Sequence, residues 1–121
     1  MRQLGQLEAT VMQHLWSVGG PVSVREMLEV LAEERPLAYT TVMTVMDNLH
    51  SKGLVTREKQ GKAYLYLPAS SRDEHTAEVL QQVLAESQDR TAALMHLVGK
   101  MDASEAADLL SALSERVEES P

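Results

Sequence analysis

The sequence lacks the residues on which several classes of protein depend. It has no cysteine, which excludes disulfides and thiolate metal sites. It has no run of about 18 apolar residues, so we expect no membrane insertion. Its first residues, MRQLGQLEATV, contain no signal-peptide hydrophobic region. These absences predict a cytoplasmic protein.

Catalytic and cofactor motifs are missing as well. The four histidines lie on different segments without the spacing of metal ligands. There is no glycine-rich phosphate loop and no pattern of a nucleophile with its base. The sequence therefore predicts that the chain is not an enzyme, has no catalytic residues, and uses no cofactor or metal.

Aromatic residues make up only 3% of the 121-residue chain, and phenylalanine is absent. The core must therefore be aliphatic, built from leucine, valine, alanine and seven methionines. A hydrophobic content of 44% with 24% charged residues is typical of a globular chain. The length suits one compact domain, or one small domain with a packed extension.

The net charge of −7 argues against a nucleic-acid partner until its distribution is considered. Residues 1–68 carry seven basic and seven acidic side chains, whereas residues 69–121 carry four basic and eleven acidic ones. Within residues 35–68, five basic side chains stand against two acidic ones. Association follows the local field rather than the total charge, so this basic segment remains a candidate for binding nucleic acid.

Two helices are predicted in the first third of the chain. Residues 6–18 show apolar side chains at helical spacing, and Gly19 ends the pattern. Ser23 and Glu26 have the spacing of a capping box that opens a second helix. Pro36 is expected to break that helix.

A third helix is predicted over residues 39–52, with Gly53 as its C-terminal cap. One side of this helix is apolar, and Met43 sits apart from that stripe. Threonine, asparagine and serine are mediocre helix formers, so a face built from them points to contact with a partner. The opposite side carries Thr40, Thr41, Thr44, Asp47, Asn48 and Ser51.

A basic hairpin follows the third helix. Residues 54–59 and 63–67 have the pattern of two strands, and Gln60-Gly61 is the expected turn. Tyr66 is expected to be structural. The tip of the hairpin carries Arg57, Lys59 and Lys62.

Three helices followed by a basic hairpin is the order of a winged helix-turn-helix, whose third helix lies in the major groove. Threonine offers a hydroxyl to phosphates or base edges and a methyl to thymine, and Asn48 has the groups to pair with adenine N6 and N7. Basic side chains would contact phosphates. The candidate DNA-binding residues are Arg25, Tyr39, Thr40, Thr41, Thr44, Asn48, Lys52, Arg57, Lys59 and Lys62.

Three other interpretations remain open. The threonine and asparagine face could be an ordinary solvated helix surface. Winged helices also serve as protein-interaction modules, in which case substituting Arg57, Lys59 and Lys62 would leave nucleic-acid affinity unchanged. A nonspecific architectural DNA binder would show no sequence preference, which the threonine and asparagine face argues against.

Residues 69–121 contain three further helical stripes, with a second possible capping box at Ser71 and Glu74. A break is expected near residues 87–89, and Asp102 is expected to start the last helix. Short helices with little to fold around are not stable alone, and the simplest partner is a second copy of the chain. The candidate dimerisation residues are Leu80, Leu84, Leu94, Leu97, Leu110, Leu113 and Val117.

The predicted fold class is therefore mainly α with a small β-hairpin. We expect a winged helix-turn-helix DNA-binding domain over residues 1–68. A helical dimerisation domain is expected over residues 69–121.

Four segments also resemble a known family, namely LGQLEATVMQHLW, PVSVREMLEVL, LAYTTVMTVMDNLHSKGLVTRE and GKAYLYLP. They resemble the penicillinase-repressor family, also called BlaI/MecI/CopY, over about residues 4–68, and the acidic tail matches in length and character. The resemblance implies a homodimeric transcriptional repressor whose winged helix binds an inverted-repeat operator, typically with TACA and TGTA half-sites. The C-terminal helices would form the dimer.

In the β-lactam-responsive branch of this family, a membrane sensor with a zinc protease domain leads to cleavage of the repressor and its release from DNA. The resemblance thus implies control of β-lactam resistance or related genes. Staphylococcal members are cut at an Asn-Phe bond, and the position that lines up here by spacing is His96-Leu97. The copper-responsive branch uses a cysteine-rich site, so copper sensing by that route is excluded.

Overall fold

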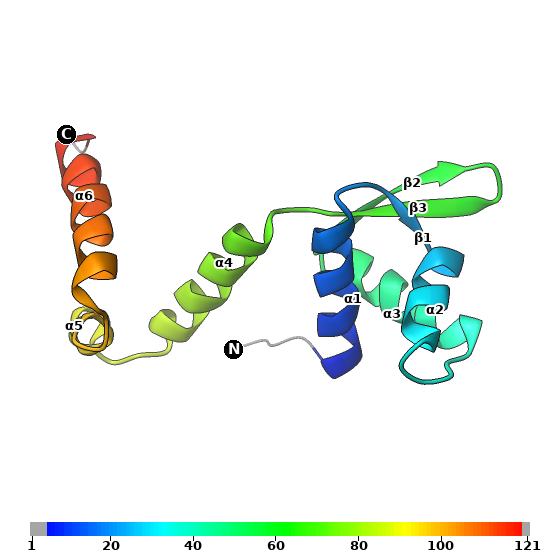
Figure 1. Ribbon diagram of the computed structural model, residues 1–121, viewed down its shortest axis with the longest axis horizontal. Helices are drawn as coiled ribbons and strands as arrows, with labels where there is room; N and C mark the ends of the chain where they lie inside the picture. The colour runs from blue at the N-terminus through cyan, green and yellow to red at the C-terminus, as the bar shows by residue number, and fades with distance from the viewer. Residues whose placement is uncertain (1–4, 120–121) are drawn as a thin grey trace. The chain divides into compact units, whose positions relative to one another are not determined.

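The structure is a computed structural model that describes residues 5–119 (Figure 1). It divides the chain into two compact units, residues 1–80 and 81–121. The boundary expected between residues 68 and 69 precedes a helix, α4 (Arg72–Ala85), whereas the two units divide within that helix. The assignment of residues 69–121 to dimerisation stays a prediction.

The first unit contains three helices and a small antiparallel sheet (Figure 1). The helices are α1 (Gln6–Val18), α2 (Val24–Ala32) and α3 (Tyr39–Ser51). The strands are β1 (Val22–Ser23), β2 (Val55–Gln60) and β3 (Ala63–Pro68), in the order β1-β3-β2. The predicted class, mainly α with a β-hairpin, is confirmed, and β1 adds a third strand that the sequence pattern does not reveal.

The hairpin turn differs by one residue from the prediction. Gln60 pairs with Ala63, so the two turn residues are Gly61 and Lys62 rather than Gln60 and Gly61. Gly61 has a φ of 63° and occupies the first turn position, where a two-residue hairpin favours glycine. Lys62 therefore lies in the turn itself, at the tip of the wing.

The predicted capping boxes are confirmed. The Ser23 hydroxyl accepts from the Glu26 N–H at 3.1 Å, and the Glu26 carboxylate accepts from the Ser23 N–H at 3.0 Å. Ser71 and Glu74 make the same pair at 3.1 and 2.9 Å. The second helix ends at Ala32, before the predicted break at Pro36.

An aliphatic core with one aromatic side chain holds the first unit together. The predicted structural role of Tyr66 is confirmed, since only 1% of its surface is exposed. Trp16 lies at the edge of this core, and its Nε1 donates to the Ser70 carbonyl at 2.9 Å. The buried side chains are Val11, Met12, Leu15, Val22, Val24, Met27, Leu31, Val42, Met46, Leu49, Val55 and Tyr66.

The remaining helices are α4, which spans the division between the units, α5 (Arg90–Val98) and α6 (Ala103–Glu119). Asp89 and Asp102 cap α5 and α6 by accepting from backbone N–H groups at 3.1 and 2.8 Å, so the predicted break and last helix are confirmed. None of the described residues in these three helices is buried.

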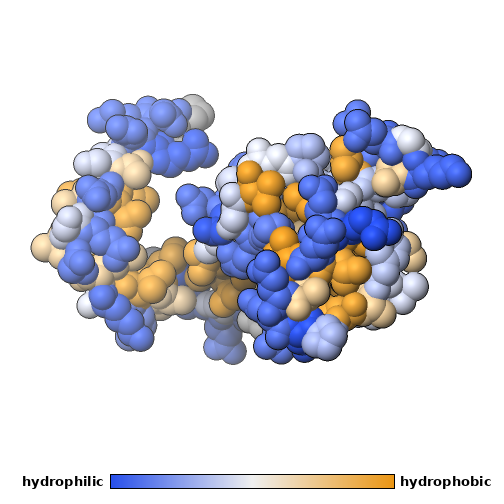
Figure 2. All heavy atoms as spheres, turned by 45° about the vertical axis from the view of Figure 1, so that its right-hand side comes forward, coloured by the Kyte–Doolittle hydropathy of each residue, from blue (hydrophilic) through white to orange (hydrophobic). Residues whose placement is uncertain are grey.

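Apolar side chains are therefore exposed along the C-terminal helices, and Figure 2 shows hydrophobic atoms on the surface of this part of the chain. The exposed set includes Leu80, Leu94, Leu97, Leu110, Leu113 and Val117, while Leu84 is half-buried. Over residues 5–119, no helix has the length and apolar character needed to cross a membrane.

Candidate nucleic-acid interface

Helix α3 has two different sides, as its sequence pattern predicts. Val42, Met46 and Leu49 are buried in the core, which fixes the rotation of the helix about its axis. The residues of the opposite side are exposed, and the wing reaches this side at Asp47. That side carries Thr40, Thr41, Thr44, Asp47, Asn48 and Ser51.

Two more candidate residues meet where α2 and α3 begin. The guanidinium carbon of Arg25 lies 5.9 Å from the centre of the Tyr39 ring, within the range of a cation–π contact. Both side chains are exposed. The structure therefore brings a cation and an aromatic hydroxyl together beside the first turn of α3.

Arg57 lies between the wing and α3 rather than at the free tip. Its Nη1 donates to Asp47 Oδ1 at 2.8 Å, and its guanidinium carbon lies 4.3 Å from the centre of the Tyr64 ring. The Tyr66 side chain and the Asp47 carboxylate both raise the pKa of Arg57. Lys59 and Lys62 are exposed, and within residues 5–119 the structure gives neither an ion pair.

Asp47 and Met43 are not among the predicted site residues, although both lie beside predicted contacts. A hollow of about 360 Å³ lies between α3 and the wing beside the Asp47–Arg57 bond. No local motif predicts this meeting, because it depends on how β2 packs against α3. The hollow is lined by Met43, Thr44, Asp47, Arg57, Tyr64 and Tyr66.

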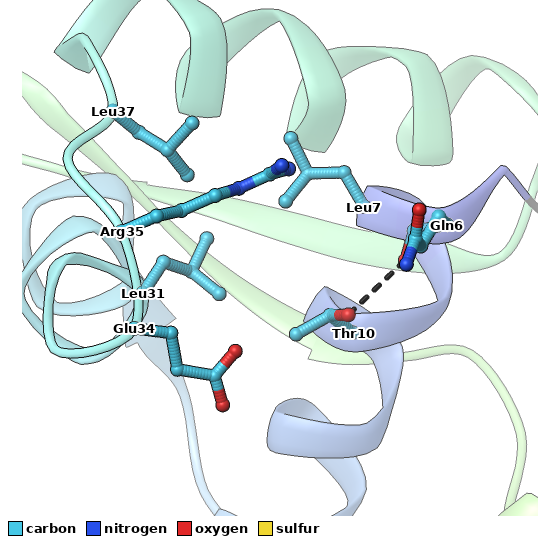
Figure 3. Close-up of a pocket in the computed structure, with 7 residues that line it drawn as sticks. All are labelled: Gln6, Leu7, Thr10, Leu31, Glu34, Arg35 and Leu37. Carbon is cyan, nitrogen blue, oxygen red and sulfur yellow. Dashed lines mark hydrogen bonds between the residues drawn. The ribbon is translucent and has the colours of Figure 1, made fainter.

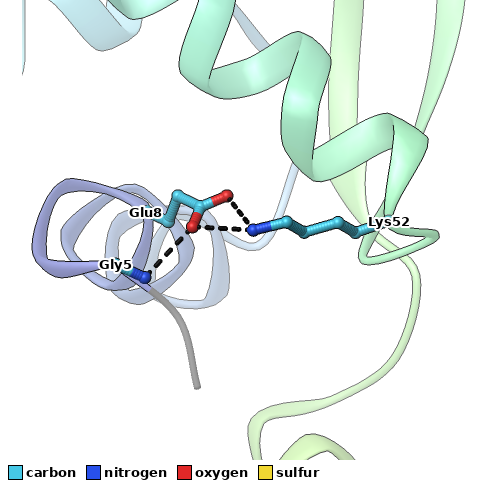
Figure 4. A network of polar contacts seen from close by, with 3 residues as sticks. All are labelled: Gly5, Glu8 and Lys52. Carbon is cyan, nitrogen blue, oxygen red and sulfur yellow. Dashed lines mark hydrogen bonds and ion pairs between the residues drawn. The ribbon is translucent and has the colours of Figure 1, made fainter. Parts of the chain in front are cut away.

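Lys52, at the end of α3, is held by an acidic residue of α1. Its Nζ lies 2.9 Å from Glu8 Oε1 and 2.8 Å from Glu8 Oε2, and Oε1 also accepts from the Gly5 N–H at 3.0 Å (Figure 4). The pKa of Glu8 is lowered, chiefly by the Lys52 hydrogen bond. Lys52 thus ties α3 to α1, and its contact with phosphate stays a prediction.

A second pocket, of about 260 Å³, contains no set of catalytic groups. Its walls come from α1, from the end of α2 and from the connection to α3. Figure 3 shows the side chain of Arg35 lying between Leu7 and Leu37, so the stem of this cation covers apolar surface. The pocket therefore lies where packed helices meet.

The cleavage candidates lie on α5. Leu97 is 47% exposed and His96 is also exposed, within a regular helix. Within residues 5–119 the structure places no group of three or more potential metal ligands together.

A buried three-helix core, an exposed helix face and a basic two-stranded wing define a winged helix-turn-helix protein. The model of the penicillinase repressor family matches residues 4–115. The transcriptional regulator BlaI of Mycobacterium tuberculosis, in strains CDC 1551 / Oshkosh and H37Rv, is 44% identical over 118 residues, which cover 95% of this chain and 86% of that protein. The chain belongs to the penicillinase repressor family and is a transcriptional repressor rather than an enzyme.

Solved structures share the fold at lower identity. The DNA-binding domain of the repressor BlaI matches with a TM-score of 0.53 and 22% identity over 60% of this chain and 87% of that one. The hsRosR-S4 complex matches with a TM-score of 0.55 and 19% identity over 89% and 94%. These likenesses confirm the winged-helix fold, whereas the individual contact residues stay predictions.

The bond between Glu8 and Lys52 generates a pH-dependent prediction. Glu8→Gln should lower the free energy of unfolding by about 0.5–1 kcal/mol at pH 7, as expected for a partly exposed ion pair. Because the folded-state pKa of Glu8 is lowered, this contribution is complete above the ordinary value of 4.5 and disappears as pH falls through the folded-state pKa. Urea unfolding at fixed protein concentration from pH 7 to pH 3 measures the difference.

The matched control is Glu29→Gln, because Glu29 is exposed on α2 and the described residues give it no ion pair. Its stability should stay close to that of the wild type at every pH. A Glu8→Gln deficit that persists unchanged at pH 3 would show that the carboxylate charge is not its cause.

Proposed function

We propose that the chain is a homodimeric repressor that binds an inverted-repeat operator. Each subunit places α3 in a major groove, with its wing on the neighbouring backbone. The observation that carries this proposal is the exposed Thr40–Ser51 side of α3, held outward by the burial of the other side. Because its partner is DNA, the protein acts in the cytoplasm.

The threonines and Asn48 supply the base contacts in this proposal. Short side chains with a hydroxyl, a methyl or an amide fit base edges in the major groove. Lys59 and Lys62 supply phosphate contacts, because both cations are exposed on the wing. Arg25 and Tyr39 contact the backbone beside the start of α3.

The C-terminal helices hold the dimer together. Leu110, Leu113 and Val117 are 65%, 61% and 72% exposed on one stripe of α6, where a single chain buries none of them. A second copy of the chain would cover this stripe, and the same contact would cover the equivalent stripe of that copy. The acidic charge of residues 69–121 also suits a part of the protein that stays away from phosphates.

Repression ends in this proposal when the dimer is weakened. One subunit on its own binds its half-site too weakly to keep the operator occupied. In the dimer, binding of the first subunit places the second at a high effective concentration near its half-site. A protease pathway controlled by a membrane sensor of β-lactams would act on the C-terminal region, near His96-Leu97. Cleavage inside α5 would separate α6 from the DNA-binding unit.

Binding to DNA from upstream of the chain's own gene, against a shuffled duplex in a salt series, tests the function. Preference for the native duplex, with affinity falling steeply as salt rises, is the expected result. Equal and salt-sensitive binding to both duplexes would favour an architectural protein. No binding to either at low salt would favour a protein-binding winged helix.

The two kinds of contact should respond differently to substitution. Asn48→Ala should cost about 1–3 kcal/mol on the operator and little on random DNA. Lys62→Ala should weaken binding to all DNA alike and reduce the salt slope by about one. Fluorescence anisotropy with both duplexes measures each effect, and Gln13→Ala, an exposed change on α1, is the control. Equal losses on both duplexes for Asn48→Ala would remove this residue from the base edge.

The dimer is tested at α6. Leu113→Asp should convert the protein to a single chain in light scattering, because the charge would be buried between subunits. Leu113 is 61% exposed in one chain, so the substitution leaves the core of the first unit unchanged. Ser111→Asp adds the same charge to the polar side of α6 and should leave the dimer intact. A Leu113→Asp protein that remains dimeric would place the interface elsewhere.

A further inference from the structure

Helix α3 carries a single acidic residue, Asp47, and this residue lies on the exposed side with Thr44 and Asn48. Its side chain is 58% exposed. A carboxylate on a surface that faces DNA meets the repulsive field of the phosphates, so it weakens binding unless it gains something in return. Its presence there needs a specific explanation.

Asp47 is held in one place by the wing. Arg57, only 24% exposed, donates from Nη1 to Asp47 Oδ1 at 2.8 Å. The same guanidinium stacks at 4.3 Å over Tyr64, which the antiparallel register places across from Lys59. The Asp47–Arg57 pair neutralises the carboxylate and fixes its direction, which is what a rigid recognition group requires.

One oxygen of this carboxylate remains available. Within residues 5–119 the structure gives Asp47 Oδ2 no hydrogen-bond partner. Asp47 also lines the hollow of about 360 Å³ between α3 and the wing, so the protein does not fill the space beside it. A fixed acceptor beside open space, next to Thr44, fits a donor that comes from outside the protein.

We propose that Asp47 reads a cytosine in each half-site by accepting a hydrogen bond from its exocyclic N4 amino group. This inference rests on the proposed function and adds a specificity-determining residue to it. Cytosine presents only a donor in the major groove, whereas guanine and thymine present acceptors that repel a carboxylate. Adenine places its N7 acceptor beside the N6 donor, which disfavours it as well. Arg57 is the positioning residue that acts through Asp47.

Selection of binding sites from a randomised duplex library, with the full chain, tests this inference. The wild type should select cytosine at one symmetry-related pair of positions. Asp47→Ala should reduce that preference by about tenfold or more and keep the preferences at other positions. Asp47→Asn, which keeps the size of the side chain, should also lose the cytosine preference. Circular dichroism shows whether each variant is folded.

Two matched controls separate base reading from charge. Glu58→Ala removes one negative charge from the exposed side of β2, so it should raise affinity for all duplexes without changing any base preference. Arg57→Ala should relax the same cytosine position as Asp47→Ala and also weaken binding generally. Lys59→Ala is the control for Arg57→Ala. It removes one positive charge from the same strand and should change general affinity without changing any base preference.

The outcomes are distinct. An Asp47→Ala protein that keeps every base preference and binds all duplexes more tightly would overturn the inference, as would selection of adenine at the position that depends on Asp47. A wild type that selects no sequence would overturn the proposed function and this inference together. Selection by the wild type without any dependence on Asp47 would overturn the inference alone.

Discussion

Burial of one side of α3 is the constraint on which the first unit depends. Val42, Met46 and Leu49 are fully enclosed, and each such side chain contributes about 1.5–3 kcal/mol relative to an exposed one. The same packing that stabilises the unit therefore decides which side chains of α3 face outward. Affinity for a partner and stability of the fold are set by opposite sides of one helix, so they can change independently.

The C-terminal helices show the opposite condition. They have the apolar stripes of packed helices, yet none of their described residues is buried within one chain. This stripe includes Leu110 and Val117, which are 65% and 72% exposed, and the contact of such apolar surface with water is unfavourable. The two units therefore differ in what stabilises them. The first unit has a buried core of its own, whereas the second requires other apolar surface to cover its side chains.

Local chemistry made most of the fold predictable from the sequence. Helix spacing, the Ser23 and Ser71 capping boxes and the breaks at Gly19 and Gly53 act within a few residues, so the sequence alone indicates them. The two-residue strand β1 was missed because it is too short to show alternation, and it exists only through pairing with β3. The exposed threonines followed from helical periodicity.

The ion pairs of the candidate site were not predictable in the same way. Glu8 and Lys52 are far apart in the chain, and Asp47 and Arg57 lie on different elements. A charge pattern read along the sequence counts Lys52 and Arg57 as free cations, whereas packing gives each of them an acidic partner. The wing cations without such partners among the described residues are Lys59 and Lys62, which leaves a smaller basic surface than composition suggests.

Trp16 is the only tryptophan of the chain, and its indole Nε1 is bonded to the Ser70 carbonyl, just after β3 ends. Its ring also lies 5.4 Å from that of His75 and 5.7 Å from the guanidinium of Arg72, both on the first turns of α4. The chain thus contains an intrinsic optical probe at the point where the winged helix leads into the C-terminal helices. Its emission would follow any rearrangement of that connection without an added label.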